Sequence, residues 1–426
     1  MAYDITAARM KPGLFALPWD TPLEQWPTEL ISALPRGISR HVVRFVEVDG
    51  EILAVKEITE HLARKEYRLL HVLDRMGQPA VDPVAVVAGR TDPAGEPLDA
   101  CLVTKHLPYS LPYRSLFSQT LRRATAVKLI DALAVLLTRV HMAGMFWGDV
   151  SLSNTLFRRD AGEFAAYVVD VETAELHERL TDGQRQHDLF LAHGNVAGEL
   201  MDLIGGGFLP EETDPLAIAD RLQERYDLLW AELTETEEIP ADQHWRVAER
   251  IGVLNELGFD VGEIEVTTDI GGAHLRIQPK IVDAGHHTRR LMRLTGLDVE
   301  ENQARRLLND LDSFTASQGR QNDDESLVAH DWLTRIYEPI TRQVPTELRG
   351  RLEPAELFHE VLEHRWYLSE QQQRAVTIEE AIVEYVDSVL PSKRPEEVLL
   401  APRDATSPET VDTPVPGEAS PSADGD

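Results

Sequence analysis

The chain has a single cysteine, Cys101, among its 426 residues, so it can form no internal disulfide and no cysteine-based zinc cluster. We interpret Cys101 as a small residue buried on a strand, a common place for an unpaired cysteine. Long apolar runs are also missing, because no stretch approaches the roughly 18 to 20 residues that a membrane-spanning helix needs. The N-terminus lacks the positive start and sustained apolar segment of a secretory signal. These absences predict a soluble protein that stays in the cytoplasm.

Basic charge is scarce as well. The chain carries 42 Lys and Arg against 73 Asp and Glu residues, which gives a formal net charge of −31. A protein that coats nucleic acid needs a basic face to neutralise phosphates, so no nucleic-acid partner is expected. An anionic nucleotide could still bind through a local positive site or a metal ion. The length and the 42% of hydrophobic residues predict two domains, or one domain with a large addition.

The first half of the chain alternates strand and helix patterns. Residues 41–56 predict two strands joined at Asp49-Gly50, a dipeptide that favours a type I′ hairpin turn, and this places Lys56 on the second strand. A helical period follows over residues 59–76, with Glu66 on its apolar stripe. The other elements predicted in this half are strands at 81–87 and 101–107, a helix at 121–142, and a hairpin formed by residues 155–158 and 164–169.

Helical patterns dominate after residue 188. One more hairpin is predicted at 262–281, turning at residues 269–272. The later predicted helices are 299–314, 327–336, 354–366 and 378–390. From about residue 391 the sequence repeats Pro, Ser, Thr and acidic residues with almost no aromatic side chains, so it cannot offset the entropy of ordering. We expect a disordered acidic tail there.

Three oxygen-bearing side chains stand at informative positions in the first half. Asp149 lies five residues before Asn154 in the loop between the long helix and the second hairpin, and Asp170 follows that hairpin. Because an antiparallel hairpin returns its two ends to one place, Asn154 and Asp170 are predicted to lie together. Carboxylate and amide oxygens so placed can share Mg²⁺. Each residue alone more commonly caps a loop, so the interpretation depends on their order and spacing.

This order of residues resembles the protein-kinase-like superfamily, in which a catalytic-loop Asp, an Asn five residues later and an Asp after the next hairpin form the centre. The sequence L-A-V-K ending at Lys56 is similar to the superfamily's V-A-I-K strand, and Glu66 is the best match to its helix-C glutamate. The resemblance implies that Lys56 neutralises nucleotide phosphates while Glu66 holds it. It also implies that Asp149 orients or deprotonates the acceptor hydroxyl, and that Asn154 and Asp170 bind the metal. In isolation, Lys56 and Glu66 could equally form an ordinary salt bridge.

More narrowly, the sequence W-G-D-V-S-L-S-N resembles the H-G-D-x-x-x-x-N loop of bacterial lipopolysaccharide (Kdo) kinases and small-molecule phosphotransferases. Trp147 stands in place of the histidine. The tripeptide His187-Asp188-Leu189 is similar to the helix aspartate that braces the catalytic loop in these families, so we interpret Asp188 as structural. This resemblance covers about residues 35–205.

The segment from Pro279 resembles a domain of unknown function found beside this kinase-like half in actinobacterial proteins, and the resemblance implies no activity. His286-His287 and Arg289-Arg290 could contact an anionic group. A solvated basic helix start is the more ordinary interpretation of these four residues.

The sequence departs from the superfamily pattern in two places. The phosphate-covering G-x-G-x-x-G is absent, and the nearest segment is R-G-I-S-R-H-V-V from residue 36. The candidates for phosphate contact in this segment are Gly37, Ser39, Arg40 and His41. Asp170 is followed by Val171-Glu172 rather than Phe-Gly, and no A-P-E segment follows, which argues against an ordinary protein-substrate kinase. Glu172 is a candidate for an additional metal ligand.

The sequence therefore predicts an α+β, two-lobed protein-kinase-like fold, with a small antiparallel-sheet N-lobe and a helical C-lobe, followed by a mostly helical C-terminal domain with a β-hairpin. The expected segments are a strap at 1–35, a kinase-like domain at 36–205, a domain of unknown function at 206–320, a helical extension at 321–390 and a tail at 391–426.

The expected function is that of an atypical kinase, which uses ATP and Mg²⁺ and transfers phosphate to a hydroxyl acceptor such as a sugar or lipid-linked sugar. One alternative is a kinase-like pseudoenzyme or scaffold that binds nucleotide, or a protein partner through its C-terminal half. Another is transfer of AMP from a nucleotide bound in the reverse direction.

Overall fold

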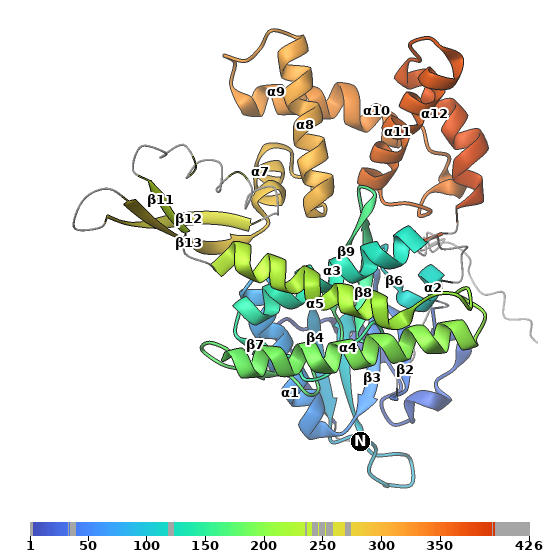
Figure 1. The fold of residues 1–426 in the computed structure, drawn as a ribbon. Helices are drawn as coiled ribbons and strands as arrows, with labels where there is room; N and C mark the ends of the chain where they lie inside the picture. The colour runs from blue at the N-terminus through green and yellow to red at the C-terminus, as the bar shows by residue number, and fades with distance from the viewer. Residues whose placement is uncertain are drawn as a thin grey trace, which may run out of the picture.

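The computed structural model describes residues 3–32, 34, 40–117, 123–234, 237–240, 246, 252, 259–268, 274–393 and 395–396. An antiparallel sheet forms the first part, a helical lobe follows it, and a mostly helical part completes the described chain (Figure 1). This is the α+β arrangement that the sequence predicts. Within the described residues, no helix is both long and apolar enough to cross a membrane.

The N-terminal sheet has the strand order β1-β4-β5-β3-β2, and every neighbouring pair is antiparallel. Its strands are β1 (Asp4–Thr6), β2 (Val43–Val48), β3 (Glu51–Ile58), β4 (Pro83–Ala88) and β5 (Ala100–Lys105). Asp49 and Gly50 join β2 to β3 with positive φ angles of 51° and 79°. Both central residues of a type I′ turn need positive φ, so this turn forms as its sequence predicts.

The two faces of this sheet enter different hydrophobic cores, because side chains alternate along a strand. Leu102 packs in a core with helix α1 (Glu60–Arg75), whereas its neighbour Cys101, fully buried, packs on the opposite face. That opposite face is covered by the N-terminal segment, whose Trp19 and Trp26 are buried against it. This segment contains three short 3₁₀ turns at Pro12–Ala16, Leu23–Gln25 and Thr28–Leu30.

The helical lobe is built on α3 (Arg123–Met142), which is apolar around most of its surface and is therefore buried at the centre. Around it lie α2 (Tyr113–Phe117), α4 (Asp182–Gly205) and α5 (Pro215–Thr234). One small sheet has the order β6-β8-β9, formed by β6 (Leu111–Pro112), β8 (Thr155–Asp160) and β9 (Glu163–Val168). The other pairs β7 (Met145–Phe146) with β10 (Glu175–Leu176), and the two sheets flank the loop of residues 147–154.

The C-terminal part begins with three strands in the order β11-β13-β12. Strands β12 (Phe259–Thr268) and β13 (His274–Ala284) lie where the sequence predicts a hairpin, and β11 (Glu237–Pro240) adds a strand that was not predicted. The predicted turn at 269–272 lies outside the described residues. The helices that follow are α7 (His286–Thr295), α8 (Glu301–Ser317), α9 (Glu325–Trp332), α10 (Glu338–Arg342), α11 (Pro354–Gln372) and α12 (Ile378–Glu384). Single π-helical turns at Leu333–Tyr337 and Tyr385–Val389 continue α9 and α12, a 3₁₀ turn at Thr346–Leu348 precedes α11, and another at Leu390–Ser392 follows the second π turn.

The hydrophobic cores group the chain differently from the predicted segments. Helix α5 contributes Ile218, Leu222 and Leu229 to the core of the helical lobe, while one separate core unites residues between 291 and 390. We therefore propose boundaries near residue 235 and near residue 285 in place of those at 205 and 320. We likewise propose that the tail starts after residue 396 in place of 391, because Glu396 is buried and forms an ion pair with Arg159 at 2.7 Å. Residues beyond 396 lie outside the described residues.

Candidate active site

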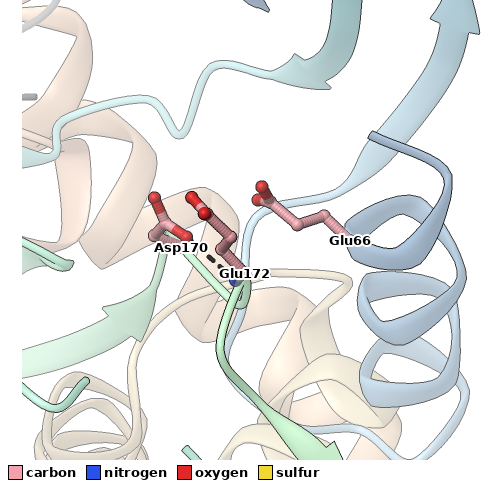
Figure 2. A group of neighbouring side chains, drawn as sticks. All are labelled: Glu66, Asp170 and Glu172. Atoms are coloured by element: carbon pink, nitrogen blue, oxygen red, sulfur yellow. Dashed lines mark hydrogen bonds between the residues drawn. The ribbon is translucent and has the colours of Figure 1, made fainter. Parts of the chain in front are cut away.

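Lys56 contacts acidic residues of both lobes. It lies on β3, and its Nζ is 2.9 Å from Glu66 Oε1 on α1 and 2.7 Å from Asp170 Oδ2, just after β9. Glu66 is fully buried, and the side chain of Lys56 is 14% exposed. Figure 2 shows the carboxyl groups of Glu66, Asp170 and Glu172 turned toward one another. These three groups can place oxygens within 4.8 Å of one another.

The electrostatics of this cluster favour a cation. Burial raises the pKa of Glu66 to about 7, the nearby Asp170 carboxylate adds to the rise, and Lys56 opposes it. Burial acts to lower the pKa of Lys56, but Asp170 and Glu66 outweigh burial and raise it, so we assign Lys56 its charged form. Among the described atoms, Glu66 Oε2 is buried and accepts no hydrogen bond. Oxygen-only donors of this kind fit a hard cation such as Mg²⁺.

The loop between β7 and β8 holds the second group of predicted residues. Asn154 Nδ2 donates to the backbone oxygen of Asp149 at 2.9 Å and to its Oδ2 at 3.0 Å. Asn195, on α4, donates to the other carboxylate oxygen of Asp149 at 3.2 Å. The Asp149 side chain stays 38% exposed, and Arg40 Nη2 lies 3.9 Å from its Oδ2. Asp149 is thus held in one orientation while its carboxylate remains accessible.

Asp188 holds this loop through hydrogen bonds to its backbone, in agreement with the structural role interpreted from the sequence. It is fully buried on α4, and its carboxylate accepts from the backbone N–H of Trp147 at 2.6 Å and of Gly148 at 2.7 Å. His141 Nε2 lies 3.1 Å from the same carboxylate. Gly148 has φ of 77°, a conformation that a residue with a Cβ rarely adopts. Glycine therefore suits this place in the loop, where the backbone N–H points at the Asp188 carboxylate.

Trp147 stands where the resembled families have histidine, and it links the loop to the segment that carries Asp170. Its ring is buried, and its Nε1–H donates to the backbone oxygen of Asp170 at 2.9 Å. Thr173 Oγ1 donates to the Trp147 backbone oxygen at 2.8 Å. The loop that carries Asp149 and the segment that carries Asp170 are therefore tied together directly.

Two residues of the site were not predicted, Asn195 and Glu199. Glu199 accepts from the backbone N–H of Leu152 at 2.7 Å and of Ser153 at 2.9 Å, which fixes the second half of the loop. A signal was present in the sequence, because spacings of 7 and 11 from Asp188 place both on the same face of α4. Helical spacing alone does not tell which surface that face covers.

Glu172 has contacts of its own beside the cluster. Its Oε2 lies 3.1 Å from His41 Nε2, and its backbone oxygen accepts from Lys65 at 2.7 Å. Its backbone N–H donates to Asp170 Oδ1 at 3.0 Å, the dashed line in Figure 2. The structure thus brings together the carboxylates of three residues, Glu66, Asp170 and Glu172. The predicted metal pair of Asn154 and Asp170 stays a prediction.

A cavity of about 860 Å³ lies between the lobes and is lined by Lys56, Asp149, Asn154 and Asp170. This volume is within the range of small-molecule sites. Its apolar wall is formed by side chains of both lobes, among them Ala54, Leu156 and Val169. A flat apolar group and a charged group of one ligand could therefore be accommodated together.

The remaining predicted residues fall in different places. Arg40 and His41 line the cavity, while Gly37 and Ser39 lie outside the described residues. In the C-terminal part, His287 Nδ1 is 2.6 Å from Glu301, and Arg290 Nη2 is 2.7 Å from Glu325. These two basic residues are engaged with neighbouring carboxylates of the helices.

Two families of known proteins match parts of the sequence. Residues 47–193 match the sequence model of the lipopolysaccharide kinase (Kdo/WaaP) family, and residues 228–390 match that of a domain of unknown function, DUF4032. Both resemblances stated from the sequence are confirmed, and the first supports a kinase-like phosphotransferase. The sequence matches no curated protein.

Solved structures similar to the chain include two kinase-like proteins. WaaP in complex with acyl carrier protein is 17% identical, with a TM-score of 0.35, over 60% of this chain and 97% of that one. An aminoglycoside-3′-phosphotransferase of type VIII is 17% identical, with a TM-score of 0.30, over 46% of this chain and 93% of that one.

Proposed function

We propose that the chain is a Mg-ATP-dependent phosphotransferase that acts on the hydroxyl group of an acceptor, a sugar or a lipid-linked sugar. The observation that carries this proposal is the convergence of Lys56, Asp149, Asn154 and Asp170 on one cavity between the lobes. Phosphoryl transfer needs mainly positioning and charge stabilisation, and these residue types supply both.

Each residue has a distinct part in the proposed reaction. Lys56, held by Glu66, neutralises charge on the nucleotide phosphates. Asp149 accepts the proton of the acceptor hydroxyl while the oxygen of that hydroxyl bonds to the terminal phosphorus of ATP. The bond between this phosphorus and the oxygen that bridges it to the next phosphate breaks, and ADP is released. Asn154 and Asp170 hold Mg²⁺, with Glu172 as a further candidate ligand. Bound Mg²⁺ supplies charge neutralisation at the phosphates.

A second candidate function is that of a kinase-like scaffold without catalysis, which would bind a protein partner through its C-terminal half. The sequence feature in its favour is the glycine-poor segment at residues 36–41, which lacks the superfamily's phosphate-covering motif. The two candidates differ in whether nucleotide is bound and consumed.

Calorimetry with Mg-ATP, followed by mass spectrometry of a cell extract incubated with protein and ATP, tests the proposal. We expect binding heat and a new phosphorylated product with the parent protein. Asp149→Asn should bind nucleotide without forming the product, and Asp131→Asn, which alters an ion pair between α3 and α5, should behave as the parent. Absence of binding heat at millimolar Mg-ATP would favour the scaffold.

A further inference from the structure

The tip of the β8–β9 hairpin is docked into the C-terminal helices. Figure 1 shows this hairpin rising from the helical lobe toward α8 and α11. The Asp160 carboxylate accepts from the backbone N–H of Gln303 at 2.7 Å and of Asn302 at 3.2 Å, and also from Asn302 Nδ2 at 2.8 Å. These backbone groups belong to the first turn of α8, whose N–H groups have no acceptor in a preceding helical turn. The side chain of Glu300, at the N-cap, also accepts from the Gln303 N–H. Asp160 therefore caps a helix that lies far away in the sequence.

Charged contacts surround this cap. Arg158 lies between Glu300, at 2.8 Å, and Glu353, at 2.5 Å. The backbone N–H of Ala161 donates to Glu356 at 2.8 Å, and the Tyr167 hydroxyl donates to Glu300 at 2.6 Å. Asp160 is 3% exposed and Glu356 also 3% exposed. Buried networks of this kind are sensitive to loss of a single member, because the partner is then left charged and unpaired.

The base of the same hairpin carries the proposed metal-binding residues. Asn154 directly precedes β8 and Asp170 follows β9, and the Val169 N–H donates to the Asn154 backbone oxygen at 3.1 Å. Pairing of the two strands is continuous from Thr155 opposite Val168 to the tip. A ladder of this length spans about 20 Å, and its unbroken pairing can transmit a displacement from one end to the other. The contacts that hold the tip can therefore influence where the base lies.

The helical lobe supports the hairpin at its base and also along β9, where Ala166 and Val168 are buried in the core of that lobe and Phe164 packs against it. Strand β6 pairs with β8 only at Leu156 and Phe157, and Ala80 pairs with β9 at Val168. Nearer the tip, Lys128 of α3 donates to the Gly162 backbone oxygen. The ion pairs and the helix cap at residues 158–161 come from α8, the start of α11 and Glu396.

We propose that the C-terminal helical part is a positioning element for the metal-binding end of the cavity, and that Arg158 and Asp160 are positioning residues that act through the hairpin on Asn154 and Asp170. The effect on nucleotide rests on the proposed function. The mechanical link between tip and base does not.

Hydrogen exchange on the full-length protein tests the link without any ligand. In Arg158→Met and in Asp160→Asn, the Ala161 amide should exchange faster at the tip, and the amides of Val168 and Val169 should exchange faster at the base. We expect the base rates to rise by about 2- to 30-fold, the range of coupling between connected sites. Arg158→Lys, which keeps the charge, should restore part of the protection.

The matched control is Arg320→Met. Arg320 also joins two carboxylates, Asp323 and Asp331, both at 2.6 Å, but all three lie within the C-terminal helical part. The base amides should then exchange at the parental rate. Affinity for Mg-ATP, measured by calorimetry, should fall in the two hairpin variants by about the same 2- to 30-fold and stay at the parental value in the control.

Three results separate failure of the inference from failure of the proposed function. Faster exchange at Ala161 with unchanged exchange at Val168 and Val169 overturns the inference, as does an unopened tip in the double variant Arg158→Met/Asp160→Asn. A parent protein that binds no Mg-ATP but shows the expected exchange at the base refutes the proposed function and leaves the link established. Circular dichroism confirms that each variant is folded.

Discussion

Replacing Asp188 with alanine should destabilise the helical lobe strongly, and the size of the effect follows from the contacts of its carboxylate. The substitution leaves the buried N–H groups of Trp147 and Gly148 without an acceptor and removes one of the two partners of His141. A buried donor left unsatisfied costs about 1 to 3 kcal/mol, so the two N–H groups together give about 2 to 6 kcal/mol. That loss is a large fraction of the roughly 5 to 15 kcal/mol that stabilises a typical domain.

Differential scanning calorimetry measures this effect. For a lobe of this size, 1 kcal/mol shifts the melting temperature by roughly 2 to 4 °C, so the transition of the helical lobe should fall by about 10 °C. Asp188→Asn keeps one acceptor oxygen and should lose about half as much. Asp220→Asn, on the exposed face of α5 beside His193, serves as the control and should change stability by less than about 0.5 kcal/mol.

The outcome also decides what Asp188 does. An alanine variant that melts within about 2 °C of the parent would show that the loop does not depend on this carboxylate, because the expected penalty is several times larger. If the variant is destabilised as expected, the loop that presents Asp149 is displaced while β3 and Lys56 are untouched. Turnover should then fall more than nucleotide affinity does.

Four further predictions concern the cavity and the docked hairpin. Asp149→Asn should keep ATP affinity and lower ATP consumption by about 10²- to 10⁴-fold, and consumption at the parental rate would exclude Asp149 as the base. Lys56→Ala should weaken nucleotide affinity and turnover together, as measured by calorimetry and ADP release. Mg-ATP should raise the melting temperature by mass action, and Asp170→Ala should abolish the part that depends on Mg²⁺. Burial raises the pKa of Asp160 and of Glu353 to about 7, above the values near 4 of unfolded chains, so their contribution to docking is present below pH 4 and is lost as the pH rises toward 7. Exchange at the tip amides, corrected for its intrinsic pH dependence, should therefore be slower at pH 5.5 than at pH 8, and a flat profile would contradict this assignment.

Local rules predicted the parts of the site that depend on short segments. The Asp49-Gly50 turn set the register of β2 and β3 and so the place of Lys56. Because an antiparallel hairpin returns on itself, Asn154 and Asp170 were predicted to lie at one end of it. In the structure Asn154 precedes β8 and Asp170 follows β9, so both lie at the same end of the hairpin and line the same cavity. In both cases the geometry follows from residues close in the sequence.

Contacts between distant segments were beyond these rules. The helical period of α5 is clear in the sequence, but it does not reveal that this helix completes the core of the preceding lobe. Asp160 lies between the two predicted strands of the second hairpin, and that pattern does not reveal that it caps α8 at a separation of 142 residues. The composition after residue 391 likewise gives no sign that Glu396 is buried, where it forms an ion pair with Arg159 of the hairpin. In each case the contact joins segments far apart in the sequence, and sequence spacing cannot identify the partner.

The charge of the cavity bears on the proposed binding of a nucleotide to so acidic a chain. Glu66, Asp170 and Glu172 can place oxygens within 4.8 Å of one another, and the one ammonium group of Lys56 contacts two of them. Polyphosphate brought to this cluster alone would meet an excess of negative charge, and at short range in a partly buried site such repulsion is screened far less than in water. A divalent cation reverses the balance, because it adds charge between the carboxylates and the phosphates. The same carboxylates that would repel free ATP would therefore favour ATP that carries Mg²⁺, and this reconciles the proposed function with a net charge of −31.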